Sequence, residues 1–171
     1  MHPGDKIQPG TFISKMHPHP KSQSNFKYLL GGLLQVKGVV KENELRRPKQ
    51  LSANGEECLL VVKNGMGTGL TIGRLTGIES VIRDYSDYGI GKTTTLEFAI
   101  LPYSHKDGTF SAASYSGSIV VDGGGCLVGL LTGSSGVADS TDVAYIMPYF
   151  WLEERIKQAF PGCFLYQTTD L

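Results

Sequence analysis

The chain has 171 residues, the length of a single domain, and a chain of this size buries about 70% of the surface that its unfolded form exposes. Its 16 basic and 16 acidic residues balance, so no net charge draws it to a polyanion or to an acidic membrane. Composition therefore excludes a nucleic-acid partner. The N-terminus lacks a charged-then-apolar leader pattern, and no run of about 18 apolar residues occurs. The sequence predicts a soluble chain with no membrane partner and favours an intracellular location.

Cysteine and histidine are too scattered to form a metal site. The 3 cysteines are odd in number and include no Cys-x-x-Cys pair. Cys58 and Cys126 stand beside apolar runs, which predicts buried thiols and leaves a disulfide as the alternative. His17 and His19 belong to a His-Pro-His-Pro run that proline keeps extended and that supplies no third ligand. The sequence predicts no metal and no cofactor.

The first third of the chain carries few signals of regular structure. Residues 1–28 are rich in proline and polar residues and follow neither a helical nor a strand period, which predicts an extended arm. Residues 29–40 are apolar with glycine punctuation and predict one or two strands. Residues 41–55 are charged and polar, and they predict a surface connection that ends in a turn at Asn54-Gly55. We expect an arm and connecting segment over residues 1–50 and a folded domain over residues 51–171.

The rest of the chain predicts an all-β domain closed by one helix. Short β-rich runs recur between glycine, asparagine and aspartate, a pattern typical of a sandwich or small barrel. The residues from Asp122 to Gly125 predict a hairpin turn. Pro148 opens a helix with apolar residues at spacings of three and four, and Pro161-Gly162 ends it. We expect strands over residues 58–63, 70–75, 79–85, 93–101, 118–121, 126–131 and 143–147.

The most informative segment is residues 110–122, in which Ser116 stands in a Ser-Gly-Ser turn before a β-branched run. This segment resembles the Gly-Asp-Ser-Gly-Ser/Gly loop of the chymotrypsin/trypsin-like serine endopeptidases. Residues 125–133 resemble the strand and substrate edge that follow the nucleophile, residues 142–148 the last strand, and residues 149–156 the C-terminal helix. Residues 61–73 are similar to a hairpin of the α-lytic and streptogrisin type. The chain as a whole is similar to fungal trypsin-like proteins.

The resemblance implies the second, C-terminal β-barrel of a chymotrypsin-like fold and a peptide or protein as substrate or partner. It implies that Ser116 is the nucleophile and that the backbone N–H groups of Ser114 and Ser116 form the oxyanion hole. It also implies a substrate pocket with an apolar floor, an edge and a rear wall, formed by Phe110, Thr132, Gly133, Val143 and Tyr145. The alternative that Phe110 is simply a core residue stays open.

The sequence departs from the family where catalysis needs it most. Ser114-Tyr115 stands in place of Gly-Asp, and no Ala-x-His segment supplies a base. His17 and His19 lie in the arm and His105 in a surface turn, so we expect none of them to be a triad member. Asp142 is expected in a turn or at the surface. The resemblance thus implies that the ancestral protein hydrolysed peptide bonds through Ser116 and that this chain is close to inert as a hydrolase.

Two alternatives to a degenerate hydrolase stay open. The same barrel could be a non-catalytic module that holds a peptide or partner protein in its cleft or along an exposed edge. The chain could also be the product of an incomplete gene, which would leave an exposed, aggregation-prone barrel face.

Overall fold

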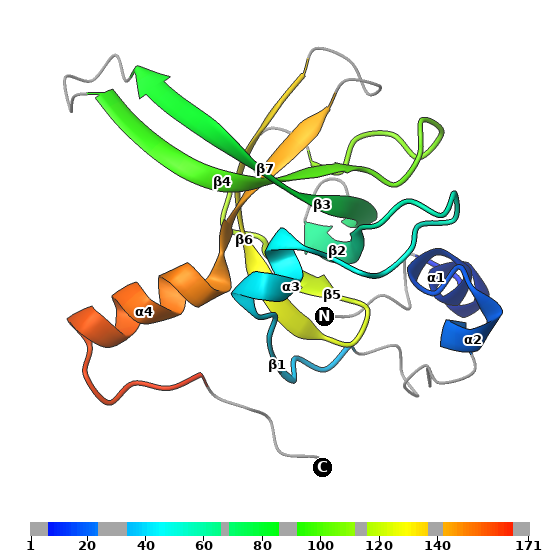
Figure 1. The fold of residues 1–171 in the computed structure, drawn as a ribbon, viewed down its shortest axis with the longest axis horizontal. Coiled ribbons are helices and arrows are strands. Elements are labelled where there is room, and N and C mark those ends of the chain that lie inside the picture. Colours follow the sequence, from blue (N-terminus) through cyan, green and yellow to red (C-terminus); the bar gives the residue numbers. More distant parts are fainter. Residues whose placement is uncertain are drawn as a thin grey trace.

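The structure is a computed structural model and describes residues 7–23, 34–65, 69–85, 92–111, 116–136 and 142–165. Within these residues, antiparallel strands close into a barrel in the ring order β2-β3-β4-β7-β6-β5, and a helix follows the last strand (Figure 1). The predicted all-β class with a C-terminal helix is confirmed. The barrel strands are β2 (Leu59–Gly65), β3 (Gly69–Tyr85), β4 (Lys92–Pro102), β5 (Ile119–Asp122), β6 (Cys126–Ser135) and β7 (Val143–Pro148).

The barrel follows a Greek-key path. Strands β2, β3 and β4 pair in sequence, and β5 then returns to lie beside β2, with Val61 opposite Asp122. Three strands in succession and a fourth beside the first define the Greek key. Strand β6 pairs with β5, and β7 joins β6 to β4, which closes the ring.

The barrel interior is apolar because each strand turns alternate side chains inward. All six strands contribute to this interior cluster, which Phe110 and the flanking Val40 and Leu45 complete. The cluster comprises Val40, Leu45, Val61, Leu75, Phe98, Ile100, Phe110, Val120, Val128, Leu131, Ala144 and Ile146.

An N-terminal helix covers the outer face of the barrel, so the predicted extended arm is wrong for this segment. Helix α1 (Pro9–Met16) begins with proline at its first turn, where the missing N–H costs nothing. Phe12 and Met16 lie one turn apart and are buried at 1% and 0% exposure. They pack with residues of β2, β3, β5 and β6, including Leu60 and Val62, in an outer cluster. The prolines concealed this helical spacing from the sequence prediction.

Two further segments differ from prediction. The expected surface connection holds a short helix, α3 (Glu42–Arg46), which buries Leu45. The expected strands 70–75 and 79–85 join into β3 through an irregularity between Leu75 and Glu79. Gly77 lies there with a φ of 83°, and a Cβ at this position would stand 2.6 Å from the carbonyl oxygen of Arg46. Of the predicted strands in residues 29–40, the described part forms β1 (Gly38–Val39), parallel to β6.

The predicted hairpin turn and terminal helix are both confirmed. The Asp122 carboxylate accepts the N–H groups of Gly124 and Cys126 at 2.9 and 2.7 Å, which fixes the turn from β5 to β6. Helix α4 (Tyr149–Ala159) follows β7 directly and projects from the barrel on the side opposite α1 and α2 (Pro20–Gln23), as Figure 1 shows. None of its residues is buried.

The cysteines are free thiols, and Cys58 is buried, as the sequence predicts. Cys126 is half-buried, so its predicted burial is wrong. Burial raises the pKa of the Cys58 thiol, which keeps it protonated and unreactive. No helix in the described ranges has the length and apolar character needed to cross a membrane.

Candidate functional site

Ser116 lies in an exposed turn at one end of the barrel, directly before β5. Three hydrogen bonds fasten this turn to β6. The Gly117 N–H donates to the Leu131 carbonyl at 2.7 Å, the Leu131 N–H donates to the Ser118 carbonyl at 2.9 Å, and the Ser116 hydroxyl donates to the Thr132 carbonyl at 2.7 Å. Gly117 has a φ of 89°, which glycine adopts without strain. The turn therefore holds the Ser116 hydroxyl in a fixed place beside β6.

The partner of the Ser116 hydroxyl is a carbonyl oxygen, and a carbonyl cannot act as a base. A serine nucleophile must pass its proton to a base within hydrogen-bond reach. Within the described ranges, the Ser116 hydroxyl has the Thr132 carbonyl as its hydrogen-bond partner and no imidazole, amine or carboxylate. Ser114 lies outside the described residues, and so does the rest of the 112–115 segment.

The described histidines lie in other places. His17 packs against the turn from β5 to β6, where a Cβ added at Gly123 would stand 3.4 Å from its ring. Burial lowers the pKa of His17, and the charge of Asp122 opposes that effect. The His19 ring nitrogen lies 3.2 Å from the Ser52 carbonyl. His105 is exposed in the connection from β4 to β5.

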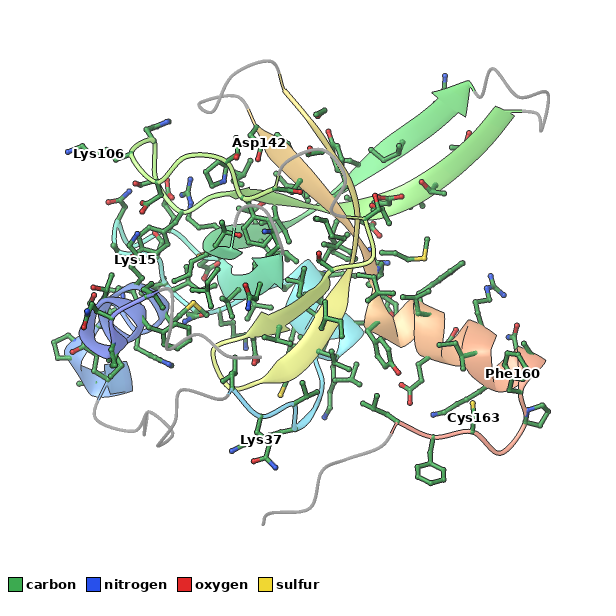
Figure 2. All side chains as sticks on the ribbon, turned by 180° about the vertical axis from the view of Figure 1, so that it is seen from behind. Lys15, Lys37, Lys106, Asp142, Phe160 and Cys163 are labelled. Carbon is green, nitrogen blue, oxygen red and sulfur yellow. The ribbon has the colours of Figure 1, made fainter. Side chains whose placement is uncertain are left out.

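Phe110 is a core residue at the Ser116 end of the barrel. Its side chain is 1% exposed within the interior cluster. The Phe110 N–H donates to the Asp142 carboxylate at 3.1 Å, and its carbonyl accepts the Thr71 hydroxyl at 2.8 Å. Asp142 is 6% exposed, so its expected place at the surface is wrong. Figure 2 places it at the end of the barrel opposite Lys37.

Lys63 brings an amine into the same end of the barrel. Its side chain is fully buried, and its amine lies 5.7 Å from the centre of the Phe110 ring. Burial lowers the pKa of Lys63 from 10.5 to about 8. A charged amine is costly in an apolar interior, so Lys63 releases its proton at a lower pH in the folded chain than in the unfolded chain.

This shift predicts a pH dependence of stability. Between about pH 8 and 10.5 the unfolded chain binds more protons at Lys63 than the folded chain does, so the free energy of unfolding rises with pH across this window. We expect Lys63→Met to lose that rise, as measured by urea unfolding from pH 7 to 10.5. Lys106→Met changes an exposed lysine and should unfold with the wild-type slope. Equal slopes in Lys63→Met and the wild type would show that the amine is not desolvated.

A groove of about 510 Å³ brings three of the predicted pocket residues together: Thr132, Gly133 and Tyr145. The residues that line it belong to β3, β4, β6 and β7. Phe110 and Val143 do not line it. Phe110 is in the core, and Val143 stands at the start of β7. The residues that line the groove are Val81, Ile82, Arg83, Thr95, Glu97, Thr132, Gly133, Ser134, Ser135 and Tyr145.

Glu97 is the site residue that sequence reasoning missed. It is 5% exposed and accepts the hydroxyls of Thr95, at 2.8 Å, and Thr132. The available signal was a single charge inside the β-rich run of residues 93–101, between Leu96 and Phe98. Thr132 links this carboxylate to Ser116, since its side chain meets Glu97 and its carbonyl accepts the Ser116 hydroxyl.

Comparison with known proteins identifies no relative by sequence. No protein-family model matches this chain, and no curated protein matches it. Among solved structures, it is similar to the crystal structure of Cellulomonas bogoriensis chymotrypsin, with 20% sequence identity and a TM-score of 0.46. The match covers 83% of this chain and 61% of that chain, so this chain spans less than two thirds of the length of the chymotrypsin it matches.

Proposed function

We propose that this chain is a serine-endopeptidase-like barrel that binds an extended peptide along β6 and does not cut it. Ser116 occupies the nucleophile position, with the N–H groups of Ser114 and Ser116 as oxyanion donors. In this proposal Thr132, Gly133 and Tyr145 line the groove that the peptide occupies, and Phe110 and Val143 support it from outside the groove. The observation that carries it is the Ser116 hydroxyl, which donates to the Thr132 carbonyl beside a groove and has no basic partner in the described part of the chain. Without a base, the rate of a serine hydrolase falls by about 10⁶.

One edge of β6 supports peptide binding. Pairing of β5 with β6 ends at Ile119 and Leu130, and no described strand continues beside Thr132–Ser135 on that side. The Leu131 N–H and the Thr132 carbonyl both point toward the Ser116 turn, across an irregularity in the β6–β7 pairing. Main-chain groups alternate in direction along a strand, so those of Ser134 point to this side as well, where no described strand lies. An extended peptide can add to such an edge through main-chain hydrogen bonds.

The test compares two substitutions of Ser134. We expect Ser134→Pro to weaken peptide binding by about 10-fold or more, because proline removes the N–H and places a ring on the edge. Ser134→Ala keeps the N–H and should bind as the wild type does. Binding is measured by fluorescence polarisation with a positional-scanning library of acetylated, amidated hexapeptides. Circular dichroism checks that both variants keep the β-barrel.

A fluorophosphonate probe and mass spectrometry test the catalytic half of the proposal. We expect bound peptides to stay intact and Ser116 to stay unlabelled, as in a Ser116→Ala control. Cleavage or labelling that Ser116→Ala abolishes would make the chain an active hydrolase. Absence of binding by every sub-library at millimolar peptide would end the peptide-binding proposal.

A further inference from the structure

The groove beside β6 contains a buried carboxylate, and this feature goes beyond general peptide binding. Phe98 and Ile100 of β4 point into the interior cluster, so Glu97, one residue before Phe98, points to the outer side of the sheet. On β7, Tyr145 stands between the inward-facing Ala144 and Ile146 and shares that outer side. Glu97 is 5% exposed yet lines the groove. Its carboxylate is therefore withdrawn from bulk water but open to an occupant of the groove.

The described residues supply Glu97 with fewer donors than its carboxylate can accept. A carboxylate offers about four acceptor sites, and the hydroxyls of Thr95 and Thr132 are its hydrogen-bond donors among the described residues. The Thr132 hydroxyl also lies 3.0 Å from the Tyr145 carbonyl, and it has one proton to share between these two acceptors. Within the same ranges, Glu97 has no ion pair with lysine or arginine. Glutamate is rarely buried this deeply unless a cation pairs with it.

We propose that this groove receives a lysine or arginine side chain of the bound peptide, whose charged head pairs with Glu97. This inference rests on the proposed function. Ser135 lines the groove, and its hydroxyl lies 2.5 Å from the Tyr145 hydroxyl, so its side chain shares the outer side of the sheet. In an added strand, the residue opposite Ser135 projects to the same side. Lysine and arginine combine a long apolar stem with a charged end. The stem would contact Ile82 and Tyr145 while the head reaches Glu97.

Gly133 and Arg83 shape the entrance to the groove. A Cβ added at Gly133 would meet no atom within 4 Å, so the space above this position is open. Arg83 is exposed on β3 and also lines the groove. Because its charge has the same sign as that of the occupant, Arg83 weakens the attraction. Screening by water limits the effect to a few-fold at an exposed position.

The experiment pairs each cationic residue with a neutral analogue of the same shape. Hexapeptide sub-libraries carry arginine or citrulline, and lysine or norleucine, at one fixed position. We expect arginine and lysine at one position to bind roughly 10- to 100-fold more tightly than their analogues, the range for a hydrogen bond to a charged group. Glu97→Gln keeps one acceptor oxygen and replaces the other with an NH2 group, which can donate to a threonine hydroxyl, and it should abolish this preference. Glu154→Gln removes an exposed carboxylate on α4 and should preserve it.

The outcomes of this experiment distinguish a failure of the cation site from a failure of the peptide-binding proposal. If the arginine peptides and the citrulline peptides bind the protein with equal affinity, the cation site is overturned and the peptide-binding proposal stays intact. No binding by any sub-library would overturn the proposed function and this inference with it. If free arginine amide bound as tightly as the arginine peptides, the site would hold a free cation rather than a peptide side chain. Arg83→Gln should tighten arginine peptides about 2- to 5-fold and leave citrulline peptides unchanged, which tests the site without altering Glu97.

Discussion

Phe110→Ala is expected to lower the free energy of unfolding by about 3–5 kcal/mol, the range for removing a buried phenylalanine ring. The ring is 1% exposed at the Ser116 end of the barrel and lies against the amine of Lys63. Gly73 makes room for it, since a Cβ at that position would stand 2.7 Å from the Phe110 ring. The Asp142 and Thr71 hydrogen bonds hold the Phe110 backbone in place, so collapse of the cavity is hindered. Urea unfolding at pH 7 measures the loss.

The matched control is Phe164→Ala, because Phe164 is 81% exposed beyond α4. This substitution should change stability by less than about 0.5 kcal/mol. A loss of under about 1 kcal/mol in Phe110→Ala would mean that the ring is not part of the core. The residue would then be free to act as the apolar floor of a substrate pocket, a role that stays a prediction.

Gly125→Ala is expected to cost more than about 3 kcal/mol or to prevent folding. Gly125 ends the turn from β5 to β6 with a φ of 87°, and a Cβ there would stand 2.0 Å from the carbonyl oxygen of Gln35. Left-handed backbone costs a residue with a Cβ about 1–2 kcal/mol, and the clash with a main-chain oxygen adds to that. The Gly125 carbonyl also accepts the Lys37 N–H at 3.0 Å, so displacement of Gln35 would detach β1 from β6.

Two glycine controls separate clash from strain. Gly55→Ala has a comparable φ of 80° with nothing near the added methyl, so it should show the strain alone. Gly124→Ala places its Cβ 3.4 Å from the Asp122 carboxylate, an ordinary contact, and should be within about 0.5 kcal/mol of the wild type. Equal thermal stability of Gly125→Ala and Gly55→Ala would show that the Gln35 carbonyl oxygen does not lie close to Gly125.

Local pattern predicted most of the barrel because each strand carries its own alternation and its own turn. The run from Cys126 to Leu131 and the helix after Pro148 lie where the sequence places them. Residues 70–75 and 79–85 were predicted as two strands because Gly77 reads as a break, yet pairing with β4 holds both in one strand. Helix α1 was missed because its stability comes from burying Phe12 and Met16 on a surface that only the folded barrel provides.

The candidate site was predictable where a motif defines it and not where the topology assembles it. The sequence marked Ser116, and the structure fixes its hydroxyl beside Thr132. The groove depends on β3, β4, β6 and β7, which the ring order brings together. Nothing local to Glu97 indicates that Thr132 lies next to it, because 34 residues separate them in the chain. Burial of that carboxylate is a property of the closed barrel.

Closure of the ring through β2 and β5 also bears on how fast the chain folds. Val61 meets Asp122 only after the roughly sixty residues between them have been gathered, an entropic cost that local pairings do not repay. Topologies dominated by such distant pairings fold in milliseconds to seconds. Until β5 arrives, β2 presents an unsatisfied edge that neighbouring molecules can join, so the interval before closure is when the nascent chain is most exposed to aggregation.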